Sequence, residues 1–287
     1  MQYGGKKCMK EHPLQIKKAI RQYKEINVDG LTLYPVKVAY FDDFQMARLA
    51  LEAMQQSFPV ALISMPFLQA VYQMDLEAYE SGQPVPGLFS SALLGLSFAL
   101  RLGEGLTPEK RMKQWAVKTD KNDPKRLKSV CTFLNGEEII EITPAKYAKL
   151  RPIIAAQNGV KQESEDANPD LVKAERDIAE MNGIKLDVNI GQMIASVCAL
   201  TGATEEEVDD WAILKLQTRS ESLIRAMNYI VYGIGGAFGG FGKGGNPVPH
   251  PFYARQEKFS ESVLSMDSFM NGAGNRAVQQ AGEQTAL

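Results

Sequence analysis

The sequence predicts a mainly α-helical protein with small β-hairpins, built as an α+β N-terminal domain followed by an all-α C-terminal domain. Apolar residues recur with helical spacing in most segments, which is the primary signal for helices. Two pairs, Asp29-Gly30 and Asn135-Gly136, lie between alternating apolar residues and so predict tight hairpins. The 287 residues also exceed the usual single-domain size of about 100–200, so one large or two smaller domains are expected.

The first expected elements are a short N-terminal segment and a hairpin. Residues 8–23 alternate basic and apolar side chains, a pattern that fits either a short helix or a flexible arm. In residues 24–38, apolar side chains alternate on both sides of Asp29-Gly30. A tight hairpin turn needs positive φ angles, and this pair supplies them.

A run of helices is expected after the hairpin. From residue 43 the apolar spacing becomes helical, and Phe58-Pro59 breaks it into two helices before residue 75. A loop with two prolines and two glycines fills 81–87, and the apolar segment 88–100 should form a buried helix. Thr107-Pro108 offers a capping hydroxyl and a proline at the first helical position, so a short helix should begin there.

A second hairpin and a helix should close the N-terminal domain. Residues 127–142 alternate in polarity around Asn135-Gly136, which is the clearest strand signal in the chain. Thr143-Pro144 repeats the pattern of a cap followed by proline and opens a helix that should stop at Asn158-Gly159.

Four regions follow from these patterns. We expect an N-terminal domain at 1–160, an acidic linker at 161–169, a helical C-terminal domain with a glycine-rich strap at 170–255, and a flexible tail at 256–287. The linker is chosen because residues 161–168 contain no large apolar side chain and so cannot add to a core.

Three helices are expected in the C-terminal domain. The first begins at Asn168-Pro169 and ends at residues 182–183, and the second covers 190–200. Thr204 and Glu207 have the spacing of a capping box, which should start a long third helix that reaches about Tyr232. The glycine-rich strap, residues 233–245, follows it with eight glycines.

Composition narrows the classes of function. A formal net charge of −2 and a pI near 5.9 give no field that attracts polyanions, so neither nucleic acid nor an acidic membrane is an expected partner. Three widely separated cysteines fit neither a disulfide framework nor a zinc knuckle. The segment 88–100 is shorter than the roughly 20 residues that span a bilayer, and no secretory signal is recognised. We expect a cytoplasmic protein.

The titratable residues suggest no catalytic or metal site. The two histidines, His12 and His250, each neighbour a proline in segments expected to be exposed. The carboxylate pairs Asp42-Asp43 and Asp209-Asp210 would point about 100° apart on a helix, and charge at a helix N-terminus explains both pairs better. We therefore expect a non-enzymatic protein with no metal.

The glycine-rich strap resembles nucleotide motifs only superficially. Gly240-x-Gly242-x-x-Gly245 lacks the preceding strand and following helix that a dinucleotide site needs, and Ala237 and Gly244 break the phosphate-loop pattern. No cofactor is expected. The aromatic residues of the strap are compatible with membrane insertion, but we interpret the segment as a loop or a contact with a partner.

A DNA-binding alternative rests on residues 191–204, whose helix, turn and following helix have the spacing of a helix-turn-helix. The charges oppose this interpretation. Residues 205–210, which would enter the major groove, contain five acidic side chains, and phosphates would repel them.

The long third helix offers a better candidate surface. Apolar residues lie along one side of it, and such stripes are usually core. Twelve methionines in the chain nevertheless suit adaptable apolar surfaces that shield another protein's helix. The candidate protein-binding residues are those of the helix together with two strap aromatics: Leu216, Leu223, Met227, Ile230, Val231, Ile234, Phe238 and Phe241.

The order of features resembles the tail assembly chaperones of tailed bacteriophages and prophages. The resemblance is carried by GLTLYPVKVAYFDDF (30–44), FPVALISMPFLQAVYQMD (58–75), ITPAKYAKLRPIIAAQNG (142–159) and LDVNIGQMIASVCALTGATEEEVDDWAILKL (186–216). It covers roughly residues 28–255 and contains no catalytic signature. It implies a protein of the host cytoplasm that shields the tape measure protein during virion morphogenesis and is displaced by tail tube subunits, with self-association between copies.

Three hypotheses therefore remain open from the sequence. The first is a tail assembly chaperone that binds the tape measure protein. The second is a structural virion component, such as a neck, connector or baseplate protein. The third is a DNA-binding regulator.

Overall fold

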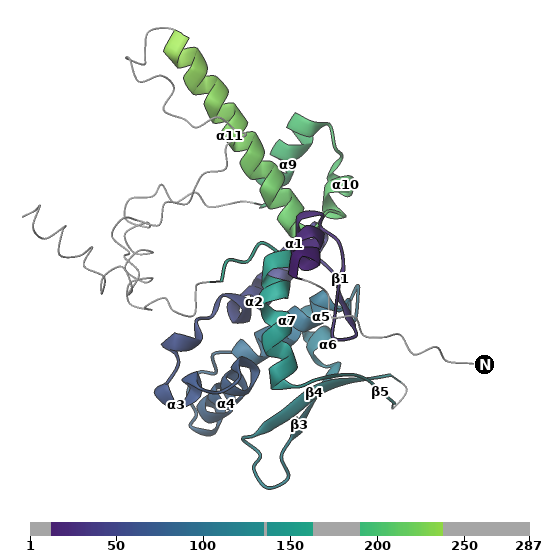
Figure 1. Ribbon diagram of the computed structural model, residues 1–287, viewed down its shortest axis with the longest axis vertical. Helices are drawn as coiled ribbons and strands as arrows, with labels where there is room; N and C mark the ends of the chain where they lie inside the picture. The colour runs from purple at the N-terminus through teal and green to yellow at the C-terminus, as the bar shows by residue number, and fades with distance from the viewer. Residues whose placement is uncertain (1–12, 135–136, 163–189, 238–287) are drawn as a thin grey trace, which may run out of the picture. The chain divides into compact units, whose positions relative to one another are not determined.

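The computed structural model describes residues 13–134, 137–162 and 190–237 (Figure 1). The expected fold class is confirmed, because helices dominate these residues and the strands form small antiparallel sheets. By compactness the chain divides into two units, Met1–Leu223 and Ile224–Leu287. The expected linker at 161–169 and the helix expected after Asn168-Pro169 lie almost wholly outside the described residues, so the predicted domain boundary stays a prediction.

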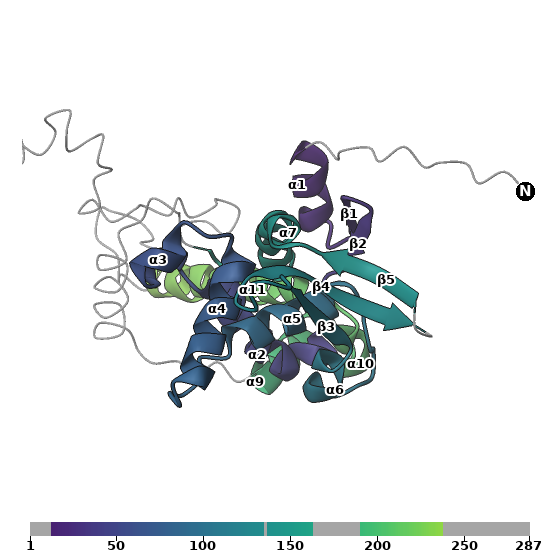
Figure 2. The ribbon, with the colours of Figure 1, turned by 90° about the horizontal axis from the view of Figure 1, so that it is seen from below.

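The first hairpin forms as predicted. Strand β1 (Ile26–Val28) pairs antiparallel with β2 (Leu31–Leu33). Asp29 and Gly30 have φ angles of 47° and 81°, the left-handed values that a two-residue hairpin turn requires. Helix α1 (Pro13–Arg21) precedes the hairpin and contacts both β1 and helix α7 (Pro144–Gln157), as Figure 2 also shows.

Four helices form the main core. Helix α5 (Leu88–Ala99) contacts α2 (Phe41–Glu52), α4 (Phe67–Glu80) and α7. As predicted, α5 is a buried helix, and every residue from Ser91 to Ala99 is buried. The sequence predicted two helices for 43–75, but the 3₁₀ turn Gln55–Ser57 and the short helix α3 (Val60–Ile63) lie between α2 and α4.

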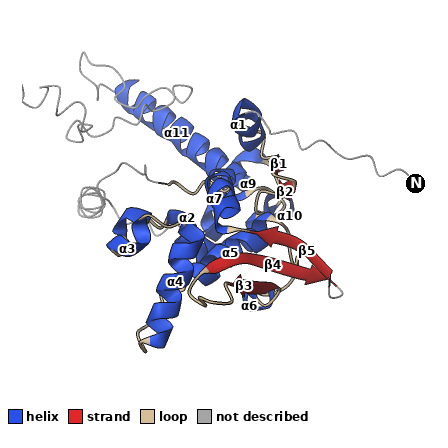
Figure 3. Cartoon of the chain, turned by 60° about the horizontal axis from the view of Figure 1, so that its bottom comes forward, coloured by secondary structure: helices blue, strands red, loops and turns tan. Residues whose placement is uncertain are grey.

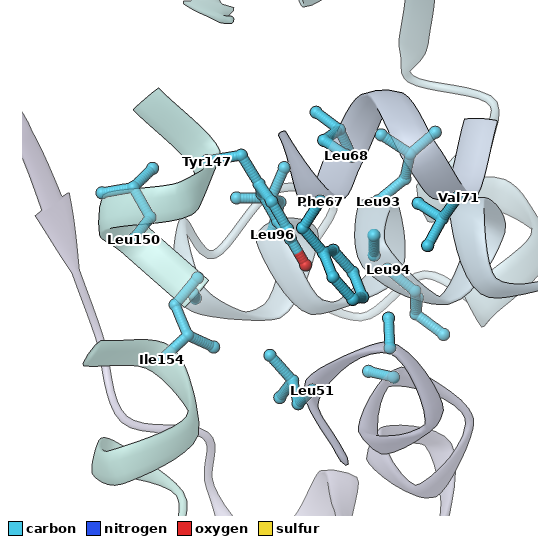
Figure 4. Close-up of a cluster of buried hydrophobic side chains, with 14 of the residues drawn as sticks. Leu51, Phe67, Leu68, Val71, Leu93, Leu94, Leu96, Tyr147, Leu150 and Ile154 are labelled. Atoms are coloured by element: carbon cyan, nitrogen blue, oxygen red, sulfur yellow. The ribbon is translucent and has the colours of Figure 1, made fainter. Parts of the chain in front are cut away.

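Figure 4 shows how these helices meet. Side chains from α7 face those of α4 and α5, and Phe67 stacks on Tyr147 with ring centres 6.2 Å apart. Each fully buried large apolar side chain contributes about 1.5–3 kcal/mol relative to an exposed one. The labelled residues of this cluster are Leu51, Phe67, Leu68, Val71, Leu93, Leu94, Leu96, Tyr147, Leu150 and Ile154.

The second sheet contains one strand more than predicted. Its order is β3 (Trp115–Thr119), β4 (Leu127–Leu134) and β5 (Glu137–Ile142), all antiparallel (Figure 3). The hairpin β4–β5 is confirmed, while its turn at 135–136 lies outside the described residues. Strand β3 was not expected. Its Trp115 Nε1 donates to Ser97 Oγ at 2.7 Å, which ties the sheet to α5.

The predicted helix starts differ in how they are capped. Helix α7 begins at Pro144, and its cap Thr143 accepts a hydrogen bond from Lys146 N at 3.2 Å, as predicted. Helix α6 (Pro108–Met112) also starts with proline, but the hydroxyl of Thr107 makes no capping bond. The expectation of a capping hydroxyl there was therefore wrong.

Residues 35–38, here called the linking segment, join the main core to a second apolar cluster. The side chain of Val36 lies in the main core, whereas that of Val38 packs in the second cluster with Val197, Val208 and Leu216. The helices after residue 190 thus share a compact unit with the N-terminal region as far as Leu223.

The linking segment also divides the predicted long third helix. Helix α9 (Ile190–Thr201) is confirmed, and the capping box of Thr204 and Glu207 forms. However, the capped helix α10 ends at Asp209, and a separate helix α11 (Ile213–Ala237) follows. The helix is interrupted because Val38 N donates to Trp211 O at 2.8 Å and Ile213 N donates to Val36 O at 2.9 Å.

Candidate functional site: the exposed seam of helix α11

The first half of α11 belongs to the core of the unit Met1–Leu223. Leu216 is 1% exposed, and Leu223 is half-buried against the same second cluster. Lys215 Nζ lies 3.7 Å from the centre of the Trp211 ring, and burial lowers the pKa of this lysine. These two predicted binding residues, Leu216 and Leu223, therefore serve mainly to pack the base of the helix.

The second half of α11, in the unit Ile224–Leu287, exposes its apolar side chains. Five of them share one side of the helix, and each is about half exposed. Four of them belong to the stripe predicted from the sequence, and the fifth, Ile224, was not predicted. The exposed fractions are Ile224 56%, Met227 47%, Ile230 53%, Val231 60% and Ile234 55%.

The spacing of these residues is that of a coiled-coil face. Ile224, Met227, Val231 and Ile234 follow one another at intervals of three, four and three residues, the a and d positions of two heptads. With Ile230 they fall within an arc of about 120° at 100° per residue. We call these five residues the α11 seam. Such a face accepts the side chains of a second helix as knobs into holes.

The helix continues farther than predicted. Its expected end was near Tyr232, but α11 runs to Ala237 and so includes the first glycines of the expected strap. Glycine in a helix costs about 0.5–1 kcal/mol relative to alanine, so local propensity alone would not place a helix there. The two remaining predicted binding residues, Phe238 and Phe241, lie outside the described residues.

The geometry of α9 and α10 weakens the DNA-binding alternative. The turn between them is made by Gly202, with φ of 75°, but α10 contains only the five residues Glu205–Asp209. Its first turn carries three exposed glutamates, one of which is used in the capping box. This short acidic helix would face phosphates with like charge.

Groups of three or more potential metal ligands are absent from residues 13–134, 137–162 and 190–237. No helix in those ranges combines the length and hydropathy of a membrane span. The fold and surface thus define a mainly helical protein with an exposed, heptad-spaced apolar seam. Comparisons with protein-family models, curated proteins and solved structures found no match.

Proposed function

We propose that this protein is a non-enzymatic tail assembly chaperone, which binds and shields the tape measure protein of a tailed phage in the host cytoplasm. The observation that carries this proposal is the α11 seam, a heptad-spaced apolar face on the exposed half of a helix. A tape measure protein is a long helical protein, and an apolar helix in water needs a complementary face.

The size of the α11 seam predicts weak binding by each copy. Fully burying one such side chain gives about 1.5–3 kcal/mol, so five half-exposed side chains offer about 4–7 kcal/mol before the entropic costs of association. One copy would therefore bind reversibly. Several copies along one long helix would bind more firmly through self-association and multivalency, and tail tube subunits could still displace them.

Co-expression with the tape measure protein, taken as the long helical protein encoded next to this chain, tests the proposal. The wild-type chain should keep that protein soluble and be recovered with it in a pull-down. Val231→Asp places a charge in the α11 seam and should reduce the recovered complex at least tenfold, the cost of about 1.4 kcal/mol or more.

A matched control lies on the same helix. Ser222 is exposed at an f position of the heptad, away from the seam, so Ser222→Asp should bind as the wild type does. Equal loss with both variants, or no solubilisation by the wild type, would reject the proposal. Circular dichroism of each variant checks that α11 still forms.

The two rival functions predict different results. A structural virion component would be found in purified particles by mass spectrometry, whereas a chaperone should be absent from them. A DNA-binding regulator would bind duplex DNA with an affinity that falls steeply as salt rises.

A further inference from the structure

A buried arginine stands out among the side chains of the main core. Arg111 on α6 is 1% exposed. Its Nε donates to Leu106 O at 3.1 Å, and its Nη1 donates to Leu102 O at 2.9 Å. The guanidinium carbon lies 4.6 Å from the ring centre of Phe98 and 5.1 Å from that of Tyr40. Two backbone carbonyls and two aromatic rings therefore fix the plane of the guanidinium.

The third nitrogen of this guanidinium is not used. Arg111 Nη2 is buried without a hydrogen-bond partner among the described residues, and none of their ion pairs includes Arg111. A buried charge without a counter-ion is costly, since arginine stays protonated at any pH that a protein tolerates. A water molecule would satisfy the N–H but would not neutralise the charge.

Arg111 also lines a small cavity with further basic residues. The cavity holds about 20 Å³, which is room for one water-sized group. Lys37 and Arg101 line it as well, and Glu104 is its single acidic lining residue. Lys37 Nζ bonds to Asp210 Oδ1 at 2.8 Å, outside the lining. With Asp210 counted beside Lys37, three cations face two carboxylates, which leaves one net positive charge around the cavity.

We propose that this cavity binds an oxyanion, the phosphate or carboxylate group of a small molecule. One oxygen enters the cavity and accepts a hydrogen bond from Arg111 Nη2, while Lys37 and Arg101 hold the remaining oxygens at the mouth. Charge-assisted hydrogen bonds from arginine to such groups are among the strongest in proteins. The site is separate from the α11 seam, and its existence does not depend on the chaperone proposal.

The competing explanation is that Glu104 itself is the counter-ion of Arg111. This exposed residue is the single acidic residue of the cavity lining, so its carboxylate competes with an external anion for Arg111. If Glu104 is the natural counter-ion, its removal should destabilise the protein and no external anion should bind. If the cavity instead takes an external oxyanion, Glu104 repels that ligand, and its removal should tighten binding.

The test is an NMR titration of the full chain with sodium phosphate and, separately, with sodium acetate, at constant ionic strength in sodium chloride. The expected result is a saturable shift of the Arg111 side-chain Nε–Hε signal with at least one of the two anions and none with chloride. The stronger anion then identifies the ligand class as phosphate or carboxylate. A response that is unsaturable, or equal with chloride, would overturn the proposal.

Variants at the mouth avoid replacing the buried arginine itself. Glu104→Gln should tighten binding about threefold and Arg101→Gln should weaken it about threefold, as expected for one partly screened charge. Lys149→Gln, at an exposed lysine paired with Asp29, is the control and should leave affinity unchanged. Unchanged affinity in Glu104→Gln, or thermal destabilisation of that variant without anion binding by the wild type, would also refute the site.

Discussion

Replacing Arg151 with methionine should cost about 3 kcal/mol of stability. The Arg151 guanidinium donates to the backbone oxygens of Ala50, Leu51 and Ala53 at the C-terminal end of α2, and it lies 3.7 Å from the Phe67 ring centre. Leu51 O also accepts a hydrogen bond from Gln162, so only the carbonyls of Ala50 and Ala53 lose their side-chain donor in the variant, at about 1 kcal/mol each. The lost cation–π contact adds about 0.5–1 kcal/mol.

Urea unfolding followed by circular dichroism would measure this effect, and the melting temperature should fall by about 6–12 °C. The control is Arg48→Met, which removes an ion pair between Arg48 and Glu52 on the same helix. That pair joins partly exposed side chains at i and i+4 and should contribute only about 0.3–0.5 kcal/mol. Equal losses in the two variants would refute the view that Arg151 holds the end of α2.

Three further predictions follow from the core and its edges. The Tyr147 hydroxyl is buried without a partner among the described residues, and burial raises its pKa, so Tyr147→Phe should keep or raise the unfolding free energy by up to about 1–2 kcal/mol in urea melts. Burial also raises the pKa of Asp75 above 3.8, whereas a backbone N–H bond lowers that of Asp120, so carbon NMR should show Asp75 titrating at the higher pH. The raised pKa means that the folded state favours protonated Asp75. Its contribution to the unfolding free energy is therefore fully present below pH 3.8 and is lost as the pH rises through the raised pKa. Asp75→Asn should remove this pH dependence of stability. Gly159 has φ of 67°, and an added Cβ would lie 2.0 Å from the movable Oε1 of Gln217 and 3.2 Å from Leu214 Cδ1. In urea melts, Gly159→Ala should therefore destabilise slightly more than Gly105→Ala, where φ is 81° and no atom lies within 4 Å.

The elements that the sequence predicted correctly depend on local chemistry. Asp29-Gly30 makes its hairpin because the turn needs positive φ angles at adjacent residues, and this requirement is met within the turn itself. The capping box at Thr204 forms for the same reason, since both hydrogen bonds join residues three apart. The buried helix α5 was predictable from its composition, because an apolar segment of that length must be covered on every side.

The failures have a common cause in contacts between distant residues. The break after Asp209 cannot be read from residues 204–232, because its cause is pairing with the linking segment more than 170 residues earlier in the chain. Strand β3 was missed because it is short and pairs with β4 across a loop, although its Trp, Val and Thr residues are good strand formers.

In the candidate site too, burial depends on contacts with distant residues that the sequence pattern does not show. A helical stripe in the sequence does not reveal where core ends and surface begins, so Leu216 and Met227 looked equivalent. The structure separates them, because Leu216 packs on Val38 and its cluster whereas Met227 is half exposed. Leu216 and Leu223 occupy the same heptad position as Ile230 in the α11 seam, so spacing alone does not distinguish the buried residues from the exposed ones.

Lys37 connects the oxyanion cavity to the base of α11. Lys37 lines the cavity, its Nζ bonds to Asp210, and its backbone pairs with Ala212 in an isolated antiparallel bridge. An oxyanion at the cavity mouth would therefore compete with the Asp210 carboxylate for the same ammonium group. The neighbouring Val38 packs against Leu216, so a change at Lys37 acts directly on the residues that hold the first turns of α11. Any effect of oxyanion binding on stability should thus appear first as altered hydrogen exchange at the amides of Val38 and Ile213, which bond across this junction.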